Sequence, residues 1–343
     1  MNWELKMKKQ KQVKKQKVSK FSVFLIIIDF MALVCFFLAY GPIDYFRDFF
    51  VTSAMTSMTH KHFAYTLYSE AEIKRILDNN KVIEPEEDTD SSKITFNPNF
   101  ETDTYESIYE EQILKKNKGN DIYKIIKLEE SSYTAYITVI YDPARVHLVS
   151  AKNLTRGGQE VEDMAEDNNA LVAINGGSAK IRNHALIPRG IFMVNGKVLS
   201  DSGKAVKIIA FNKDHVLVLS KMTSKQAKKA GIVDAVCFGP YLIVNGKAAK
   251  FNGDGGYGNR PRTAIGQRQD GIVLFVTING KAGFNGATME ELTKIFVRYK
   301  TYNAANLDGG GSTTLVEKGK LVNNPAGWGY TGARHVANAF IVK

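Results

Sequence analysis

A run of 20 residues, Phe21–Tyr40, constrains this chain more than any other feature. It reads FSVFLIIIDFMALVCFFLAY, and its ionisable groups are Asp29 and the weakly acidic Cys35 and Tyr40. Roughly 20 apolar residues are enough for a helix to cross the hydrocarbon core of a bilayer. The preceding residues, 1–20, hold eight lysines and one glutamate, and a basic flank of this kind stays in the cytoplasm. The sequence therefore predicts a basic cytoplasmic tail (1–20), a transmembrane anchor in the cell membrane (21–40) and an extracytoplasmic C-terminal domain.

A cleaved signal peptide is the alternative, but its apolar region is normally shorter, and a small-x-small cleavage site follows it closely. Here Gly41-Pro42 leads instead into four aromatic residues that suit the outer membrane interface: Tyr45, Phe46, Phe49 and Phe50. We therefore favour an uncleaved, single-pass anchor. Asp29 is costly inside the span, so it either pairs with a membrane-protein partner or is tolerated through local water.

The net charge excludes one class of function. The chain has 343 residues and a formal charge of +11, which at first suggests a nucleic-acid-binding protein. Residues 1–20 alone carry +7, so the other 323 residues carry only +4, and no nucleic-acid partner is expected. The two cysteines are Cys35, inside the apolar run, and Cys237, so an internal disulfide is not expected either. The fold has to be stabilised by its hydrophobic core.

Residues 41–120 are interpreted as a stalk with short helices. Helical patterns are expected over residues 60–80 and 105–118, and the acidic, polar stretch 84–104 between them is typical of a flexible linker. The alternative is that part of this region packs on the body as an N-terminal extension. From about Asp121 the sequence becomes rich in β-branched and aromatic residues, which marks the start of the folded body, residues 121–343.

Short strands joined by tight turns dominate the pattern of the body. Residues 133–141 carry a strand signal, and residues 145–149 are expected to pair with them. Asn-Gly pairs recur, and several lie between apolar runs as they do in hairpins. Helices are predicted at residues 159–168 and from about Thr288 onwards. The expected fold class is α+β, with a mixed, largely antiparallel β-sheet core and a few packed helices, preceded by one N-terminal transmembrane helix.

The most informative local motif is residues 306–312, Asn-Leu-Asp-Gly-Gly-Gly-Ser. Three successive glycines reach backbone conformations that other residues avoid, and no side chains obstruct their N–H groups. Such a loop can form a concave nest for an anion, with Asp308 as an acid beside it. A tight turn between two strands is the simpler interpretation.

Two apparent nucleotide-binding motifs are rejected. Residues 253–258 match G-x-G-x-x-G, but Asn-Arg-Pro follows where that fingerprint needs a helix. The glycine run 309–311 lacks the Gly-Lys-Ser/Thr end of a P-loop. We expect the 253–258 loop to cover the substrate, and a structural calcium ion on Asp254 and Asn252 is the one cofactor that it suggests. No catalytic metal is indicated.

Two charged residues have both a structural and a chemical interpretation. Glu291 follows Thr288 by three residues, so the pair fits a capping box at the start of a helix. Arg262 is either an ordinary surface arginine or a fork for phosphate or carboxylate, the anions that a guanidinium group binds best.

Seven short motifs occur in order between Tyr133 and the C-terminus. They are residues 173–177 (AINGG), 239–242 (GPYL), 262–266 (RTAIG), 286–292 (GATMEEL), 306–312 (NLDGGGS), 323–325 (NNP) and 334–340 (RHVANAF). This ordered set resembles the phosphodiester glycosidase family. That family usually has two aromatic residues after Asn-Gly-Gly, whereas this chain has Ser178-Ala179, which suggests either a different or bulkier glycan or a weakened enzyme.

The resemblance implies a hydrolase that cleaves the sugar–phosphate bond of glycosyl-1-phosphate diesters in cell-envelope or exopolysaccharide glycans. A phosphate monoester is a good leaving group, so the main task is to hold and neutralise the phosphate. Asp308 is the first candidate for the catalytic carboxylate and Glu291 the second. The implied substrate- and phosphate-binding residues are Arg262, Arg334, Asn175, Gly176, Gly177, Gly309, Gly310, Gly311, Ser312 and Asn324.

Two other functions stay open at this point. One is a non-catalytic module that binds phosphate-containing cell-wall or capsule polymers near the membrane. The other is a scaffold that joins an envelope assembly through Asp29 and the stalk. Tight binding of such a polymer without turnover distinguishes the first from an enzyme, and loss of function on exchange of the anchor alone identifies the second.

Overall fold

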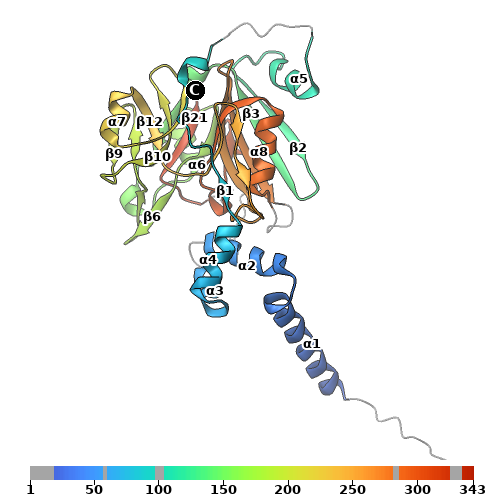
Figure 1. Cartoon of the computed structure of the whole chain (residues 1–343). Helices are drawn as coiled ribbons and strands as arrows, with labels where there is room; N and C mark the ends of the chain where they lie inside the picture. Colours follow the sequence, from blue (N-terminus) through green and yellow to red (C-terminus); the bar gives the residue numbers. More distant parts are fainter. Residues whose placement is uncertain (1–18, 57–59, 97–103, 281–285, 325–333) are drawn as a thin grey trace, which may run out of the picture.

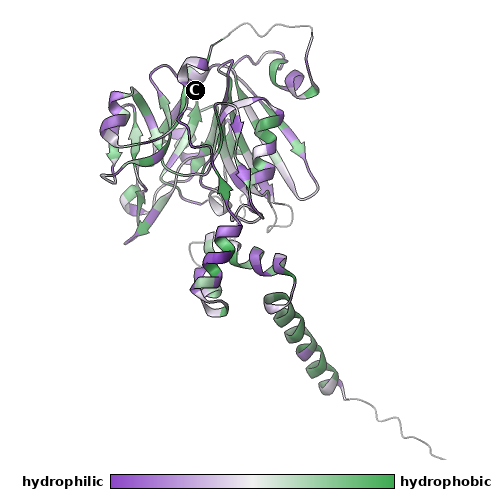
Figure 2. Ribbon diagram, viewed as in Figure 1, coloured by the Kyte–Doolittle hydropathy of each residue, from purple (hydrophilic) through white to green (hydrophobic). Residues whose placement is uncertain are grey.

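The computed structural model describes residues 19–56, 60–96, 104–280, 286–324 and 334–343. A long helix, α1 (Lys20–Tyr40), stands apart from a β-rich body, and a group of shorter helices lies between them (Figure 1). None of the α1 side chains is buried, and Figure 2 shows the helix hydrophobic along nearly its whole length. Within the described residues, α1 is the one helix long and apolar enough to cross a membrane, a property that signal sequences share.

The shorter helices pack into a small unit of their own, which we call the helical unit: α2 (Asp44–Thr56), α3 (Lys61–Leu67) and α4 (Glu70–Asn79). Its apolar core consists of Val51, Ala54, Ala64, Tyr68, Ile73 and Ile76. Two hydrogen bonds join it to the end of α1. The Tyr40 hydroxyl donates to the Leu67 carbonyl at 2.9 Å, and the Tyr68 hydroxyl donates to the Ala39 carbonyl at 3.0 Å. The helical unit thus holds α1 at a defined place relative to the body.

The segment after the helical unit runs along the body. β1 (Val82–Ile83) pairs with β15 (Lys250–Phe251). Glu84 then accepts a hydrogen bond from the Tyr241 amide at 2.8 Å, and the Thr89 amide donates to the Leu219 carbonyl at 3.1 Å. Over residues 84–96 the structure therefore shows the packed N-terminal extension and not the flexible linker that its acidity suggests, because its polar groups bond to the body. Residues 97–103 of that stretch lie outside the described residues.

Three antiparallel sheets form the body. The first has the order β14 (Lys247–Ala248), β13 (Tyr241–Val244), β18 (Thr301–Asn306), β16 (Arg262–Arg268), β17 (Val273–Gly280), β3 (Tyr133–Ile140), β2 (Tyr123–Glu129). The second has the order β11 (Leu217–Met222), β10 (Val206–Asn212), β12 (Ile232–Val236), β8 (Phe192–Val194), β9 (Lys197–Ser200). The third has the order β20 (Lys320–Leu321), β19 (Leu315–Glu317), β5 (Val172–Asn175), β21 (Asn338–Val342), β4 (Val146–Ser150). A separate hairpin is formed by β6 (Ala179–Arg182) and β7 (Ala185–Pro188).

The three sheets share one central core, to which they contribute Phe275, Phe192 and Phe340 respectively. A helix covers the outer face of each sheet: α8 (Met289–Arg298) on the first, α7 (Ser224–Lys229) on the second and α6 (Val161–Asp167) on the third. Another helix, α5 (Ile108–Leu114), buries Ile113 in the same outer cluster as α8. This layered arrangement confirms the expected α+β class.

The Asn-Gly turns form as the sequence predicts. Asn195-Gly196 joins β8 to β9, with φ angles of 49° and 75°. Asn245-Gly246 joins β13 to β14, with φ angles of 52° and 77°. Two positive φ values in succession define the primed hairpin turn, which asparagine and glycine adopt at the lowest cost. The predicted helices at residues 159–168 and after Thr288 are also confirmed, as α6 and α8.

The predicted pairing of residues 145–149 with residues 133–141 is wrong. β3 pairs with β2 and β17, whereas β4 pairs with β21 in a different sheet. The reason lies in the connection, where Asp142 caps a 3₁₀ turn, Pro143–Arg145, by accepting the Ala144 amide at 2.9 Å. This turn redirects the chain into the neighbouring sheet instead of returning it along β3.

Candidate functional site

The glycine motif begins where β18 ends. Leu307 is buried in the central core, and the chain leaves the sheet at Asp308. Two contacts from the end of β5 hold this point: the Asp308 amide donates to the Gly176 carbonyl at 3.1 Å, and Asn175 Nδ2 donates to the Asp308 carbonyl at 2.6 Å. The ends of two strands from different sheets therefore fix the position of the Asp308 carboxylate.

The three glycines form a 3₁₀ turn, η5 (Gly310–Ser312), and not an open nest of amides. The Gly309 amide donates to its neighbour Asp308 at Oδ1, 3.2 Å away, and the Gly310 amide donates to the Pro261 carbonyl at 2.8 Å. Of the three glycine amides, therefore, at most that of Gly311 is left to bind a ligand. Glycine is still required, because Gly310 has a φ of 62° and a Cβ on Gly309 would lie 2.8 Å from the Pro261 oxygen.

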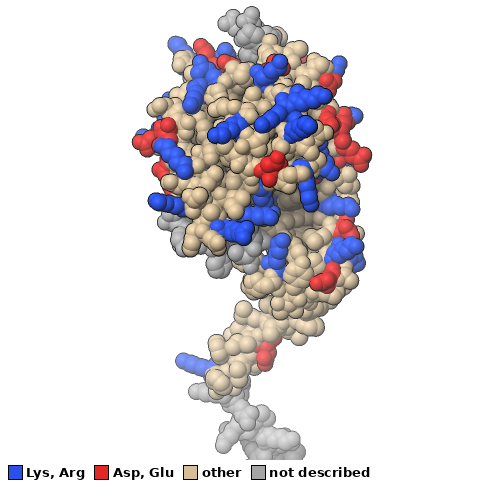
Figure 3. All heavy atoms as spheres, turned by 90° about the vertical axis from the view of Figure 1, so that its left-hand side faces the viewer, with Lys and Arg blue, Asp and Glu red and all other residues tan. Residues whose placement is uncertain are grey.

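A pocket of about 860 Å³, which we call the glycine-loop pocket, opens over this turn. Figure 3 shows a hollow between the body and the helices below it, with lysine and arginine side chains around its rim. The lining residues come from the helical unit, the β5–β6 connection, the β6–β7 hairpin and the residue after it, the glycine turn, and the segments that follow β12, precede β16 and precede β21. They are Met55, Thr56, Lys61, Gly177, Ser178, Ala179, Lys180, Ile181, Leu186, Arg189, Phe238, Arg260, Asp308, Gly309, Gly310, Gly311, Ser312, Arg334, His335, Val336 and Ala337.

Asp308 is the one carboxylate among the described residues that line this pocket, and it is accompanied by five lysine and arginine side chains. Burial raises the pKa of Asp308 above its ordinary value because the ionised form loses hydration. A hydrogen bond from Ser312 and the charge of Arg334 oppose that rise, and Arg189 adds a smaller contribution. The carboxylate is therefore tuned by groups of the same pocket, as acids that take part in chemistry often are.

Arg262 does not line the pocket. Its side chain is 4% exposed, and it donates to the carbonyls of Ala287 at 2.9 Å, Tyr257 at 3.0 Å and Gly258. Burial lowers the pKa of Arg262, but a guanidinium group stays charged at neutral pH, so the three carbonyls act as its counter-dipoles. In the structure Arg262 thus fastens the 253–258 loop to the body and does not reach the place where the sequence put a phosphate.

Glu291 does not line the pocket either. It forms the capping box of α8 with Thr288: its carboxylate accepts from the Thr288 amide at 2.8 Å, while the Glu291 amide donates to the Thr288 hydroxyl at 3.1 Å. Of the two interpretations of Glu291, the structure shows the capping box. The Glu291 carboxylate is therefore used by the helix cap and is absent from the pocket lining.

The Asn-Gly-Gly segment after β5 has a mainly supporting role. Asn175 is fully buried and accepts the Thr263 hydroxyl at 2.7 Å, in addition to its bond to Asp308. A Cβ on Gly176 would lie 2.2 Å from Asn338 Oδ1, and the Gly177 amide donates to that same oxygen at 2.7 Å. Of these three predicted residues, Gly177 is the one that lines the pocket.

The predicted residue Asn324 is exposed and is absent from the pocket lining. Its neighbour Asn323 is buried instead, and its Oδ1 accepts the Leu315 amide at 2.6 Å. The structure does bring Ser312 and Arg334 to the pocket, beside Asp308. His335, next to Arg334, lines the same pocket and lies 3.9 Å from Glu160.

Sequence reasoning missed four cations of the pocket: Lys61, Lys180, Arg189 and Arg260. Arg260 stands two residues before Arg262, so the sequence pointed to the right segment and selected the buried arginine in place of the one that lines the pocket. Arg189 follows Pro188 at the end of the β6–β7 hairpin, where no motif marked it. Lys61 belongs to the helical unit, and its nearness to the pocket depends on tertiary packing.

The 253–258 loop, which the sequence suggested as a calcium site, contacts the helical unit through Asp254. Asp254 Oδ2 accepts from the Thr52 hydroxyl at 2.6 Å, and Oδ1 accepts from the Gly256 amide at 2.7 Å. The loop is thereby attached to α2 of the helical unit. Across the described part of the chain, no group of three or more His, Cys, Asp or Glu side chains is placed to hold a metal ion.

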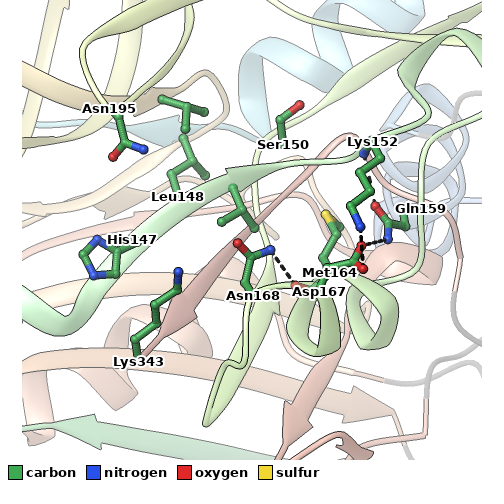
Figure 4. A pocket seen from close by; sticks show the side chains of 12 residues that line it. His147, Leu148, Ser150, Lys152, Gln159, Met164, Asp167, Asn168, Asn195 and Lys343 are labelled. Carbon is green, nitrogen blue, oxygen red and sulfur yellow. Dashed lines mark hydrogen bonds and ion pairs between the residues drawn. The ribbon is translucent and has the colours of Figure 1, made fainter.

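A second pocket, of about 450 Å³, lies near the C-terminus, and we call it the C-terminal pocket (Figure 4). Lys152 and Asp167 form an ion pair there at 2.6 Å, and Gln159 donates to the same carboxylate at 2.6 Å. Burial lowers the pKa of His147, the charge of Asp234 opposes this shift, and the charge of Lys343 adds to it. Lys152, Gln159 and Asp167 of this pocket are therefore bonded to one another.

Comparisons with known proteins match the part of the chain that holds these strand ends. Residues 168–343 match the family described as phosphodiester glycosidase. The chain is 25% identical over 184 residues to N-acetylglucosamine-1-phosphodiester alpha-N-acetylglucosaminidase of Bos taurus, covering 48% of this chain and 34% of that protein. It is 40% identical over 65 residues to the SPbeta prophage-derived uncharacterized protein YomE of Bacillus subtilis (strain 168), covering 19% of this chain and 10% of that protein.

Among solved structures, the fold is similar to that of the zebrafish N-acetylglucosamine-1-phosphodiester alpha-N-acetylglucosaminidase catalytic domain auto-inhibited by pro-peptide. The TM-score is 0.54 at 21% identity, over 64% of this chain and 81% of that one. At this identity the likeness concerns the fold. The chain spans only about a third of the length of its bovine relative and a tenth of the prophage protein.

Proposed function

The chain belongs to the phosphodiester glycosidase family, and from this premise we propose that it hydrolyses the bond between the anomeric carbon and the phosphate of glycosyl-1-phosphate diesters. The observation that carries the proposal is the glycine-loop pocket, in which one carboxylate, Asp308, lies among Arg189, Arg260 and Arg334. Guanidinium groups are the preferred partners of phosphate oxygens, and a single acid beside them is what hydrolysis at the adjacent carbon needs.

In the proposed reaction, a water molecule attacks the anomeric carbon while the bond from that carbon to the phosphate oxygen breaks. The electron pair of this bond leaves with the phosphate, so the products are a free sugar and a phosphate monoester. Asp308 accepts the proton of the attacking water and faces the positive charge that develops on the sugar ring. The arginines neutralise the negative charge that builds up on the leaving phosphate.

This reaction does not require a second carboxylic acid. An ordinary glycoside has a poor leaving group that must be protonated, which is why most glycosidases use two carboxyl groups. A phosphate monoester leaves more readily, since its second pKa is about 6. The pocket lining, with Asp308 as its single carboxylate among the described residues and Glu291 held in the α8 cap, fits this simpler requirement.

The proposal includes an extracytoplasmic location. Its support is the 21-residue length of α1 and the absence of buried residues from it, together with the lysines that precede it. With the N-terminus in the cytoplasm and α1 as an uncleaved anchor, the pocket faces phosphate-containing glycans of the cell envelope or exopolysaccharide. Asp29 lies exposed on α1, and pairing with a second membrane protein is one way to satisfy it.

The position of bond cleavage tests the proposed reaction. The full chain in detergent micelles is incubated in ¹⁸O-labelled water with sugar 1-(methyl phosphate) diesters, beginning with that of N-acetylglucosamine. Cleavage at the anomeric carbon leaves the methyl phosphate product unlabelled in mass spectra. Label in the methyl phosphate would mean attack at phosphorus, and tight binding without any product would favour the non-catalytic module.

A further inference from the structure

One wall of the glycine-loop pocket does not belong to the body. Met55 and Thr56 at the end of α2 and Lys61 at the start of α3 line the pocket from the side of the helical unit. These residues lie outside the stretch 168–343 that matches the family. In Figure 1 the helical unit sits between α1 and the body, so this wall is on the side nearest the proposed membrane.

Buried contacts hold the helical unit against the body. Thr52 is fully buried, and its hydroxyl donates to Asp254 Oδ2 at 2.6 Å. On the other side of that loop, Asn80 Oδ1 accepts the Asp254 amide at 3.1 Å. The packing is so close that a Cβ on Gly253 would lie 1.8 Å from the Asn80 side chain. The wall is therefore a fixed part of the pocket and not a loosely tethered neighbour.

The packing of the helical unit against the body also positions a cation of the pocket. The Arg260 guanidinium donates to the Ser53 carbonyl of α2, and Arg260 lines the pocket from the body side. Burial lowers the pKa of Arg260, so the carbonyl dipole of Ser53 compensates for part of the lost hydration. The helical unit thus contributes Lys61 directly and holds Arg260 in place.

The pocket carries more positive charge than a simple diester needs. Its lining includes Lys61, Lys180, Arg189, Arg260 and Arg334 against the single carboxylate of Asp308. A phosphodiester brings only one negative charge. Lys61 is exposed and has no ion-pair partner within 4.0 Å among the described residues, whereas Arg47 and Arg75 of the same unit are both paired. An unpaired lysine on the wall of an already cationic pocket is available to a second anionic group.

We propose that Lys61 is a specificity-determining residue that binds a second negatively charged group of the substrate. The inference rests on the proposed function and narrows its substrate class to glycosyl phosphodiesters that carry at least one further anionic group. A second phosphate and a carboxylate on the esterified alcohol both carry the negative charge that the Lys61 ammonium group would bind. The helical unit then belongs to the active site, although it lies outside the part of the chain that matches the family.

The test compares two substrates that differ in the charge of one group. Both are 1-phosphate diesters of the same sugar, and the esterified alcohol is either ethylene glycol or its phosphate monoester. kcat/KM for each is measured with the full chain in detergent micelles, for wild type, Lys61→Ala and Lys74→Ala. Lys74 is the matched control because it is an exposed lysine of α4 that does not line the pocket.

We expect Lys61→Ala to lower kcat/KM for the substrate with the second anionic group by about three- to tenfold more than for the simple diester, mainly through KM. Added salt should reduce the difference, since the contact is exposed to solvent. Equal effects on both substrates, or the same effect from Lys74→Ala, would overturn the inference while leaving the proposed function intact. If wild type cleaves neither diester, the proposed reaction fails. The inference is then judged by calorimetric titration of the same pair, and equal affinities in wild type and Lys61→Ala refute it.

Discussion

The glycine-loop pocket and the C-terminal pocket contain similar residue types but arrange their charges differently. In the C-terminal pocket, Lys152 is neutralised by Asp167 at 2.6 Å, and Gln159 completes the hydrogen bonding (Figure 4). In the glycine-loop pocket, the Asp308 carboxylate faces a surplus of cations that is not matched by acids of the lining. Internal pairing is typical of a structural surface, whereas unbalanced charge in a concave site is available to a ligand.

The comparison also shows why burial of a charge is not by itself a sign of function. Arg262 is more buried than the arginines that line the glycine-loop pocket, yet its guanidinium donates its hydrogen bonds to three backbone carbonyls of the protein. Asp308 is partly buried too, but it faces a pocket, and neighbouring cations adjust its pKa. A buried charged group whose partners all belong to the protein has a structural role, whereas one that faces a pocket can also interact with a ligand.

The largest expected effect is on activity, and it contrasts the carboxylates of the two pockets. Asp308→Asn removes the proposed general base and should lower kcat/KM by about 10³- to 10⁴-fold, or about 4–5.5 kcal/mol. The matched change in the C-terminal pocket, Asp167→Asn, should leave kcat/KM unchanged. Steady-state hydrolysis of a glycosyl phosphodiester checks both. Similar activities for the two variants would remove the distinction between the pockets.

The same Asp308→Asn variant should be more stable than wild type at neutral pH. The folded-state pKa of Asp308 lies above its unfolded value, so the folded protein binds more protons and loses stability as the pH rises through that interval. An asparagine side chain cannot ionise and escapes this loss, so the gain should be present at pH 7 and absent below about pH 4. Denaturant unfolding of the full chain in detergent micelles at several pH values measures it, and a loss of stability at pH 7 contradicts the prediction.

The third prediction concerns the buried arginine behind the pocket. Arg262→Ala leaves carbonyls of the 253–258 loop and of Ala287 without their donor, and it should lower the free energy of unfolding by about 3–4 kcal/mol. Thermal unfolding measures the loss. Because Arg262 does not line the pocket, its loss should lower activity only through the fraction of molecules that unfold. A stable but inactive Arg262→Ala protein would instead support the direct phosphate contact that the sequence suggested.

The fourth prediction is that Arg334→Ala affects catalysis without affecting the fold. It should lower kcat/KM by about 10- to 100-fold, because a phosphate partner is lost. Arg334 also opposes the raised pKa of Asp308, so its removal should move the acidic limb of the pH–rate profile to higher pH. The profile of kcat/KM against pH, together with the melting temperature, separates this effect from unfolding. An unchanged acidic limb shows that Arg334 does not influence Asp308.

The smallest effect is expected in the C-terminal pocket. Lys152→Ala breaks an exposed ion pair, and such pairs contribute little to stability. Both kcat/KM and the melting temperature should stay close to their wild-type values. A clear loss of activity in this variant would show that the C-terminal pocket also takes part in function.

Patterns with a local cause were predictable from the sequence. Asn195-Gly196 and Asn245-Gly246 form hairpin turns because both residues tolerate positive φ, and Thr288 with Glu291 forms a cap because their spacing suits the first turn of a helix. The motif at Asp308 was recognisable as a candidate site because three glycines beside an acid are unusual. By contrast, the partner of strand β4 was predicted incorrectly, since a short turn at Asp142–Arg145 decides which sheet the chain enters.

The sequence alone determined the apolar span at Phe21–Tyr40, the α+β class, the family resemblance and Asp308 as the first candidate for the catalytic carboxylate. The span and the motif at Asp308 depend on residues that are near neighbours in the chain, and the class and the resemblance depend on the order of such local patterns. Only the tertiary structure decided that Arg262 is enclosed by carbonyls, that Arg189 and Arg260 line the pocket, and that Lys61 of the helical unit lines the same pocket as the glycine turn. The physical reason is that a charged side chain acquires its role from the groups that surround it, and here those groups come from segments distant in sequence.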